Sequence, residues 1–153
     1  MKKIKIDYLS TLFVGIDIGS RTNVISALNF DQDFLIRMVP VANAQGGAEQ
    51  MEEMVAQVLS QHHEFKAVII SLESTGFYGV HIANYLSTSE KLAPFSTRVY
   101  CLNPNEVKQY KKSFNSLDKN DGIDSFVIAD FARVGRIHTE PWRGAQYLAL
   151  QRL

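Results

Sequence analysis

The sequence is poor in the features that would tie it to an oxidising or membrane environment. Cys101 is the only cysteine among 153 residues, which excludes an internal disulfide and a zinc site built from several cysteines. No apolar run approaches the roughly 20 residues of a membrane-spanning helix, and residues 1–10 lack the apolar stretch of a secretory signal. We therefore expect a cytoplasmic protein with no membrane partner.

The formal net charge at pH 7 is zero, which taken alone argues against a protein that binds nucleic acid strongly. The charges are unevenly distributed, however. Residues 1–90 contain 6 Lys and Arg against 10 Asp and Glu, whereas residues 91–153 contain 10 against 6, so the two halves carry −4 and +4. An acidic pocket beside a basic flank suits a metal-dependent enzyme that acts on phosphodiesters, although such asymmetry also arises by chance.

The hydrophobic residues, 46% of the chain, are numerous enough for one domain with a sizeable core. Their periodicity predicts strands at residues 12–16, 23–30, 34–41, 67–72 and 97–102, and helices at 48–61, 78–86, 105–114 and 121–136. The order β-β-β-α-β-α-β-α-α predicts an α/β fold. Its mixed sheet has three antiparallel strands followed by two parallel strands, with helices on both faces. This is the arrangement of the ribonuclease H-like folds.

One charged residue, Asp17, interrupts the first apolar strand. An ionised carboxylate in such a strand is normally paired, hydrogen-bonded or bound to a metal. The neighbouring Gly15 and Gly19 leave room for another backbone, an ion or a phosphate. The alternative is that Asp17 only caps the turn after the strand.

Further carboxylates occupy comparable positions. Glu73 ends the fourth predicted strand, and the carboxyl ends of neighbouring parallel strands meet at one edge of a sheet. Asp121 and Asp124 are three residues apart, which places them on one face of a helix. Asp130 lies nine residues beyond Asp121, about half a rotation away, so we expect it not to join them.

Four converging carboxylates would repel one another unless cations were present. Hard oxygen ligands favour Mg²⁺ or Mn²⁺ over zinc. Two such ions roughly 4 Å apart can activate an attacking oxygen and stabilise the leaving oxygen of a phosphodiester.

Four blocks of this sequence resemble those of the DEDD transposases, the insertion-sequence family numbered 110, which also includes the Piv DNA invertase. The blocks occur in the family's order over most of the chain: GIDIGS at 15–20, ESTGFY at 73–78, NPNEVKQY at 103–110 and KNDGIDS at 119–125. The resemblance implies a RuvC-like domain of a bacterial recombinase, with catalytic and metal-binding residues Asp17, Glu73, Asp121 and Asp124. The family usually has Thr at the position of Asn120 and Ala at that of Ser125, two small departures beside the ligands.

The resemblance also implies partners. Members of the family join a RuvC-like domain to a carboxy-terminal transposase domain that contributes a catalytic serine, and a structured guide RNA bridges donor and target DNA. We expect residues 1–142 to form the catalytic domain and residues 143–153 to begin a helix leading to an absent second domain. DNA, a guide RNA and a homo-oligomer of the full-length protein are the expected partners, and the fragment alone is expected to be inactive.

Basic residues follow the fifth predicted strand and could contact nucleic acid. A helix over 105–114 interleaves lysines with aromatic residues, which suits a phosphate backbone, or alternatively a solvated face with its aromatics in the core. The candidates for nucleic-acid binding are Lys108, Lys111, Lys112, Lys119, Arg133 and Arg136.

Two competing functions remain open from the sequence. The block GIDIGS also resembles the phosphate-binding turn of actin-like ATPases and sugar kinases, but the second phosphate loop and the adenosine motif of those proteins are not found. A non-catalytic nucleic-acid-binding module with a vestigial acidic cluster is the other alternative. The preferred interpretation is a metal-dependent transposase or recombinase that cleaves DNA and transfers strands.

Overall fold

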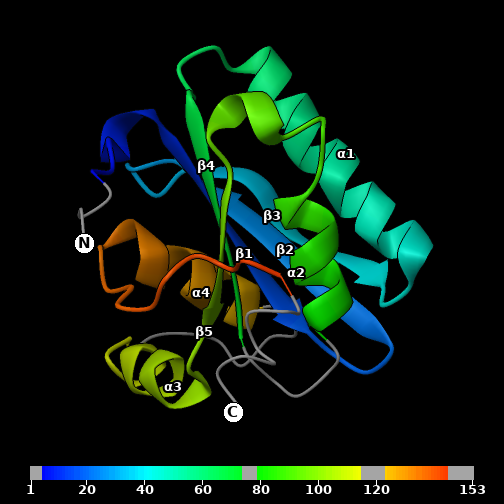
Figure 1. Ribbon diagram of the computed structural model, residues 1–153. Coiled ribbons are helices and arrows are strands. Elements are labelled where there is room, and N and C mark those ends of the chain that lie inside the picture. The colour runs from blue at the N-terminus through cyan, green and yellow to red at the C-terminus, as the bar shows by residue number, and fades with distance from the viewer. Residues whose placement is uncertain (1–4, 74–78, 115–122, 145–153) are drawn as a thin grey trace.

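The computed structural model describes residues 5–73, 79–114 and 123–144. Within them a five-stranded sheet has the strand order β3-β2-β1-β4-β5 (Figure 1). The strands are β1 (Thr11–Ile18), β2 (Thr22–Leu28), β3 (Phe34–Ala42), β4 (Ala67–Glu73) and β5 (Arg98–Leu102). The helices are α1 (Gln45–Gln61), α2 (Val80–Ser87), α3 (Pro104–Lys112) and α4 (Ile123–Arg133), with short 3-10 turns at Tyr8–Ser10 and Ala93–Phe95.

The pairing of the strands confirms the predicted mixed sheet. β2 pairs antiparallel with both β1 and β3, whereas β4 pairs parallel with both β1 and β5. β3 departs from a regular ladder near Met38, whose φ is +42°. The Ser26 hydroxyl accepts a hydrogen bond from the Met38 amide at 3.1 Å, so the irregularity leaves that amide satisfied.

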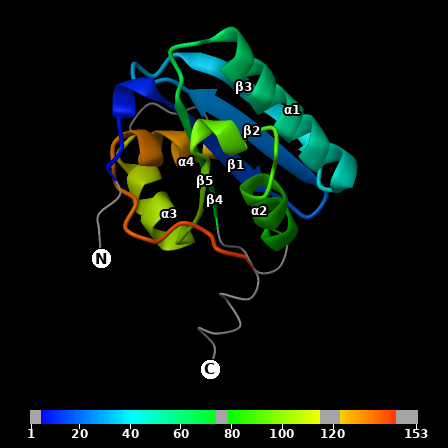
Figure 2. The same cartoon turned by 45° about the horizontal axis from the view of Figure 1, so that its top comes forward.

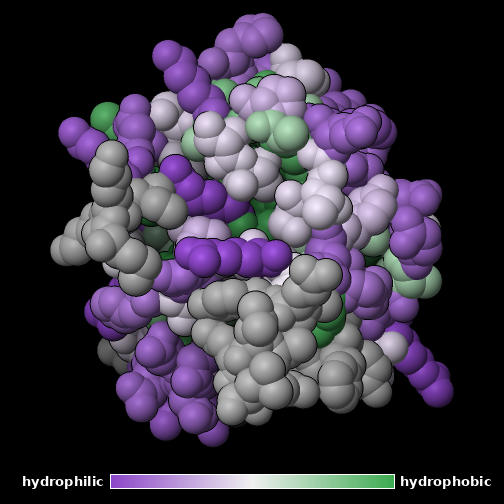
Figure 3. All heavy atoms as spheres, viewed as in Figure 1, coloured by the Kyte–Doolittle hydropathy of each residue, from purple (hydrophilic) through white to green (hydrophobic). Residues whose placement is uncertain are grey.

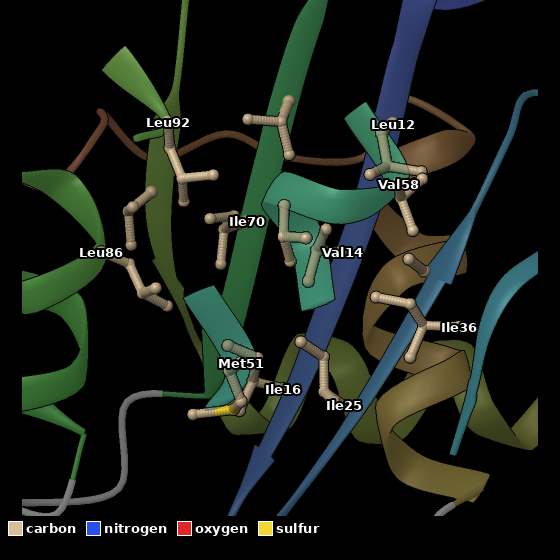
Figure 4. Close-up of a cluster of buried hydrophobic side chains, with 14 of the residues drawn as sticks. Leu12, Val14, Ile16, Ile25, Ile36, Met51, Val58, Ile70, Leu86 and Leu92 are labelled. Carbon is tan, nitrogen blue, oxygen red and sulfur yellow. The ribbon is translucent and has the colours of Figure 1, made fainter. Parts of the chain in front are cut away.

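The helices cover both faces of the sheet, as predicted (Figure 2). On one face α1 and α2 pack over residues of all five strands. Figure 4 shows apolar side chains of this layer pointing toward one another; among them are Leu12, Val14, Ile16, Ile25, Ile36, Met51, Val58, Ile70 and Leu86. On the other face α3 and α4 pack over Phe13, Ile69, Tyr100 and Leu102. The alternation of side chains along each strand thus divides the core into two layers.

Among the coloured residues of the face seen in Figure 3, hydrophilic ones dominate, and hydrophobic ones are visible in smaller patches between them. The exposed large hydrophobic residues of the described ranges are Leu9, Phe30 and Val134. No helix among the described residues is long and apolar enough to cross a membrane.

Two helices begin earlier than expected. α1 starts at Gln45 rather than Ala48, so Gly46 and Gly47 lie in its first turn instead of breaking it. Gly47 is required there because a Cβ would meet the Ala42 carbonyl oxygen at 1.7 Å. α3 starts at Pro104 because proline suits the first helical position and the Asn103 side chain accepts a hydrogen bond from the Asn105 amide at 2.8 Å.

Gly15 in the middle of β1 decides how closely α4 approaches the sheet. A Cβ on Gly15 would lie 2.1 Å from the Ser125 carbonyl oxygen and 2.5 Å from the Ala129 nitrogen. The buried hydroxyls of Ser125 and Ser26 form a hydrogen bond at 2.7 Å beside this contact. The amino-terminal half of α4 therefore rests directly on the backbone of β1.

Replacing Gly15 by Ala tests this contact. We expect the free energy of unfolding to fall by about 3 kcal/mol, since the added methyl group meets helix backbone that cannot give way locally. Urea unfolding followed by circular dichroism measures the change. The matched control is Gly46→Ala, because a Cβ at Gly46 meets nothing within 4 Å; this variant should be unchanged or up to about 1 kcal/mol more stable. Wild-type stability in Gly15→Ala would show that α4 does not need this close approach.

Candidate active site at the carboxyl ends of two parallel strands

Asp17 and Glu73 lie side by side at one edge of the sheet. β1 and β4 are parallel neighbours with Ile16 opposite Leu72, so the next residues of the two strands, Asp17 and Glu73, follow the same register. Side chains alternate along a strand, and Gly15 faces α4, which puts Asp17 on the α4 face as well. The expected meeting of these two carboxylates at a strand edge is therefore found.

Asp124, the second residue of α4, is the third carboxylate of the site. The pKa of Asp17 is raised, first by burial and then by the charge of Asp124. The pKa of Glu73 is raised by burial, then by the charge of Asp17 and then by that of Asp124. Each of these shifts favours the protonated acid. The three groups are thus electrostatic neighbours although they come from three elements far apart in the sequence.

Lys111, near the carboxyl end of α3, supplies a positive charge at this cluster. Its Nζ donates to Asp124 Oδ1 at 2.5 Å. Its charge also lowers the pKa of Asp17 and of Glu73, against the larger effects that raise them. The lysine was predicted to contact nucleic acid, and sequence reasoning did not anticipate its ion pair with a site carboxylate.

The donor set fits a divalent cation in its chemistry, because three half-buried carboxylates that repel one another offer hard oxygen ligands. As they stand, the side chains within the described ranges form no group of three close enough to hold a metal ion, and Asp124 is turned toward Lys111. Asp121, the fourth predicted ligand, lies outside the described residues. Binding a metal through all three described carboxylates therefore requires these side chains to move closer together.

Asp130 does not join the cluster, as predicted from its place on α4. It is buried, with 1% of its side chain exposed, and it pairs with the Arg133 Nε at 2.6 Å. It also accepts hydrogen bonds from the Tyr110 hydroxyl at 2.6 Å and from the Gln32 amide at 3.0 Å. Burial and this bond to Asp130 raise the pKa of Tyr110. Asp130 ties α4 to α3 and to the turn between β2 and β3.

The other predicted nucleic-acid-binding residues occupy different surroundings. Lys108 and Lys112 are exposed on α3. Arg133 is 19% exposed, held by Asp130 and by a bond from its Nη1 to the Phe30 carbonyl oxygen. Arg136 places its guanidinium 5.2 Å from the centre of the Tyr110 ring. Lys119 lies outside the described residues.

A polar network that sequence reasoning missed holds the turn after Asp17. The Asn23 side chain accepts from the Gly19 amide at 3.1 Å and donates to the Asn43 side chain at 3.2 Å. The Asn43 amide group donates in turn to the Gly19 carbonyl oxygen. The sequence feature that could have indicated this network is Asn23, a polar residue at the first buried position of β2. The network fixes the chain where it leaves the site.

Asp130 and Asp124 make a matched pair for testing structural against functional carboxylates on one helix. Asp130→Asn should lower the free energy of unfolding by about 3 kcal/mol, because it removes one partner of a buried ion pair. Asp124→Asn should change it by less than about 0.5 kcal/mol, since the pair with Lys111 is 42–43% exposed. Urea unfolding measures both. Equal losses in the two variants would contradict the distinction.

The raised pKa of Asp17 predicts that Asp17→Asn increases the free energy of unfolding, by an amount that depends on pH. Because the folded state favours the protonated acid, the free energy of unfolding of the wild type is highest below the unfolded pKa of about 3.9. It falls as the pH rises through the raised folded pKa and Asp17 ionises. In EDTA at pH 7 the variant should therefore be about 0.5–1 kcal/mol more stable than wild type, discounted for solvent screening. The difference should shrink as the pH falls toward 4, when measured by urea unfolding. Exposed Glu90 gives the control, Glu90→Gln. A gain that persists unchanged at pH 4 would contradict the assigned cause.

Two of the solved structures that resemble this one are RuvC structures. RuvC of T. thermophilus in complex with a Holliday junction substrate matches with a TM-score of 0.54 and 16% identity, over 86% of this chain and 99% of that chain. A second Thermus thermophilus RuvC structure matches with a TM-score of 0.52 and 14% identity over the same shares. At these identities the likeness shows the fold, and it confirms the predicted RuvC-like, ribonuclease H-like class.

The sequence comparison gives the family. No curated protein sequence matches this chain. The profile of the IS110 DEDD transposases, described as Transposase, matches residues 14–153. That range contains all four sequence blocks and spans well over half of the chain, which confirms the resemblance noted from the blocks. The protein therefore belongs to the IS110 family of DEDD transposases.

Proposed function

We propose that this domain cleaves DNA phosphodiesters, and takes part in strand transfer, with divalent cations held by Asp17, Glu73 and Asp124 together with Asp121. The observation that carries the proposal is the convergence of three carboxylates from β1, β4 and α4 on one edge of the sheet. A structural capping role for Asp17 does not explain why two further acidic groups from distant segments face it.

Two bound Mg²⁺ or Mn²⁺ ions would activate the attacking oxygen and stabilise the leaving oxygen of the scissile phosphate. The fold itself positions the carboxylates beside one another before a cation binds. Asp17 and Glu73 sit on neighbouring strands joined by backbone hydrogen bonds, and their half-burial strengthens their interaction with a cation. Their mutual repulsion favours cation binding, since a cation relieves it.

DNA is the substrate that we propose. One of the two similar RuvC structures is a complex with a Holliday junction substrate, and this chain carries exposed Lys108 and Lys112 on the helix that reaches the carboxylate cluster. Contacts from Lys119, Arg133 and Arg136 belong to the same proposal. A guide RNA, a homo-oligomer and a further domain beyond residue 142 remain predictions for a full-length protein.

The test combines metal binding with DNA cleavage. The 153-residue chain should unfold at a higher temperature in Mn²⁺ than in EDTA; metal at 100 times its Kd stabilises the fold by about 2.7 kcal/mol. Asp17→Asn and Glu73→Gln should lose most of this increase. In a protein that also carries the expected second domain, the same substitutions should reduce metal-dependent DNA cleavage by roughly a hundredfold or more, because a direct metal ligand is lost.

The control is Glu53→Gln, which removes a carboxylate that pairs with Lys91 on the surface formed by α1 and the residues after α2. It should keep the Mn²⁺-dependent increase. Binding of DNA without any response to Mn²⁺ would favour a non-catalytic module instead. Full cleavage by the Asp17→Asn protein would refute the assignment.

A further inference from the structure

Lys111 is the cation that the chain itself places at the carboxylate cluster. Its Nζ lies 2.5 Å from Asp124 Oδ1, and its charge acts on Asp17 and Glu73 as well. One ammonium group thus offsets part of the repulsion among three acidic groups. Lys112, the next residue on α3, is exposed and has no such effect on Asp17 or Glu73.

The backbone of Lys111 is held close to the site by the packing of α3 on α4. Val107 is buried between them, and the Tyr110 ring lies 5.7 Å from the Phe131 ring, edge to face. The Tyr110 hydroxyl donates to buried Asp130. With Tyr110 held in this way, the adjacent Lys111 stays within reach of Asp124.

An ammonium group and a divalent cation repel each other, so each weakens the binding of the other to the same carboxylate. While Nζ lies 2.5 Å from Oδ1 of Asp124, its positive charge offsets the negative charge that would attract a metal. Both side chains are about 42–43% exposed, so the pair is partly solvated and can open without unpacking the core. The pair is therefore able to exchange one cation for another.

We propose that Lys111 is a built-in competitor of the divalent metal: it occupies Asp124 in the metal-free protein and is displaced when the metal binds. This inference rests on the proposed metal site and adds a residue that sets its affinity. Lys111 acts here as a positioning residue, because it holds Asp124 and is not itself a metal ligand. The metal-free fold then gains a counter-charge, at the cost of weaker metal binding.

Metal affinity tests this directly. Mn²⁺ binding to the 153-residue chain can be followed by electron paramagnetic resonance of free Mn²⁺, at neutral pH and about 150 mM salt. Lys111→Met keeps the apolar stem of the side chain and removes its charge. We expect its Kd for Mn²⁺ to fall by about three- to tenfold. The matched control Lys112→Met removes the same charge one residue away, where screening weakens it, and should change Kd by less than about twofold.

Thermal unfolding supplies a second readout. In EDTA Lys111→Met should unfold at a lower temperature than wild type, because the carboxylates lose their counter-charge. In saturating Mn²⁺ the difference should disappear or reverse, since the metal then supplies the positive charge. A lysine that only packs α3 onto α4 would lower the unfolding temperature equally in both conditions, and that result would overturn the proposal.

The remaining outcomes separate this inference from the proposed function. If wild type binds Mn²⁺ and Asp17→Asn abolishes binding, but Lys111→Met leaves the affinity unchanged or weaker, the competitor role is wrong and the metal site stands. If Lys111→Met and Lys112→Met lower the Kd for Mn²⁺ equally, the effect comes from the net charge of α3 at long range. That result would also overturn the role of the ion pair. If wild type binds no Mn²⁺, both proposals fail.

Discussion

The contact between α4 and the backbone of β1 at Gly15 is the constraint on which the site depends. Because no side chain stands between them, the helix lies close enough for the Ser125 carbonyl to approach the strand, and the Ser26 hydroxyl meets that of Ser125. Asp124 immediately precedes this contact. The position of the third carboxylate is thus set by backbone packing in the core, and the strands that carry Asp17 and Glu73 form the other side of the same contact.

Asp124 and Asp130 show how one helix uses two acidic residues differently. Asp130 is buried and fully engaged by Arg133, Tyr110 and Gln32, so its charge holds elements together. Asp124 is partly exposed, next to two carboxylates that repel it, and has only a solvated lysine as its ion-pair partner among the described residues. Repulsion of this kind lowers the stability of the fold. It is typical of a site kept for binding a cation, where function and stability are in conflict.

Much of the fold could be predicted because local patterns agree with the tertiary structure. The buried strands β1 and β4 are apolar runs of strand length, and Asp130 stays apart from the cluster, as the helical period predicts. The prediction was less accurate where a residue type is compatible with two kinds of local structure. Gly46 and Gly47 look like a break in the sequence, yet α1 includes them because Gly47 must pass close to Ala42. That requirement comes from a neighbouring strand, which no local pattern contains.

The sequence by itself determined the order of the elements, the mixed sheet and the identity of the candidate carboxylates, since periodicity and the family blocks are both properties of the chain read in order. Only the tertiary structure decided the partners of the basic residues. Lys111, Lys112 and Arg133 look alike in sequence, but the first faces Asp124, the second faces solvent and the third is held by buried Asp130. The physical reason is that a charge acts through space over a few ångströms, and the packing of α3 on α4 sets those distances.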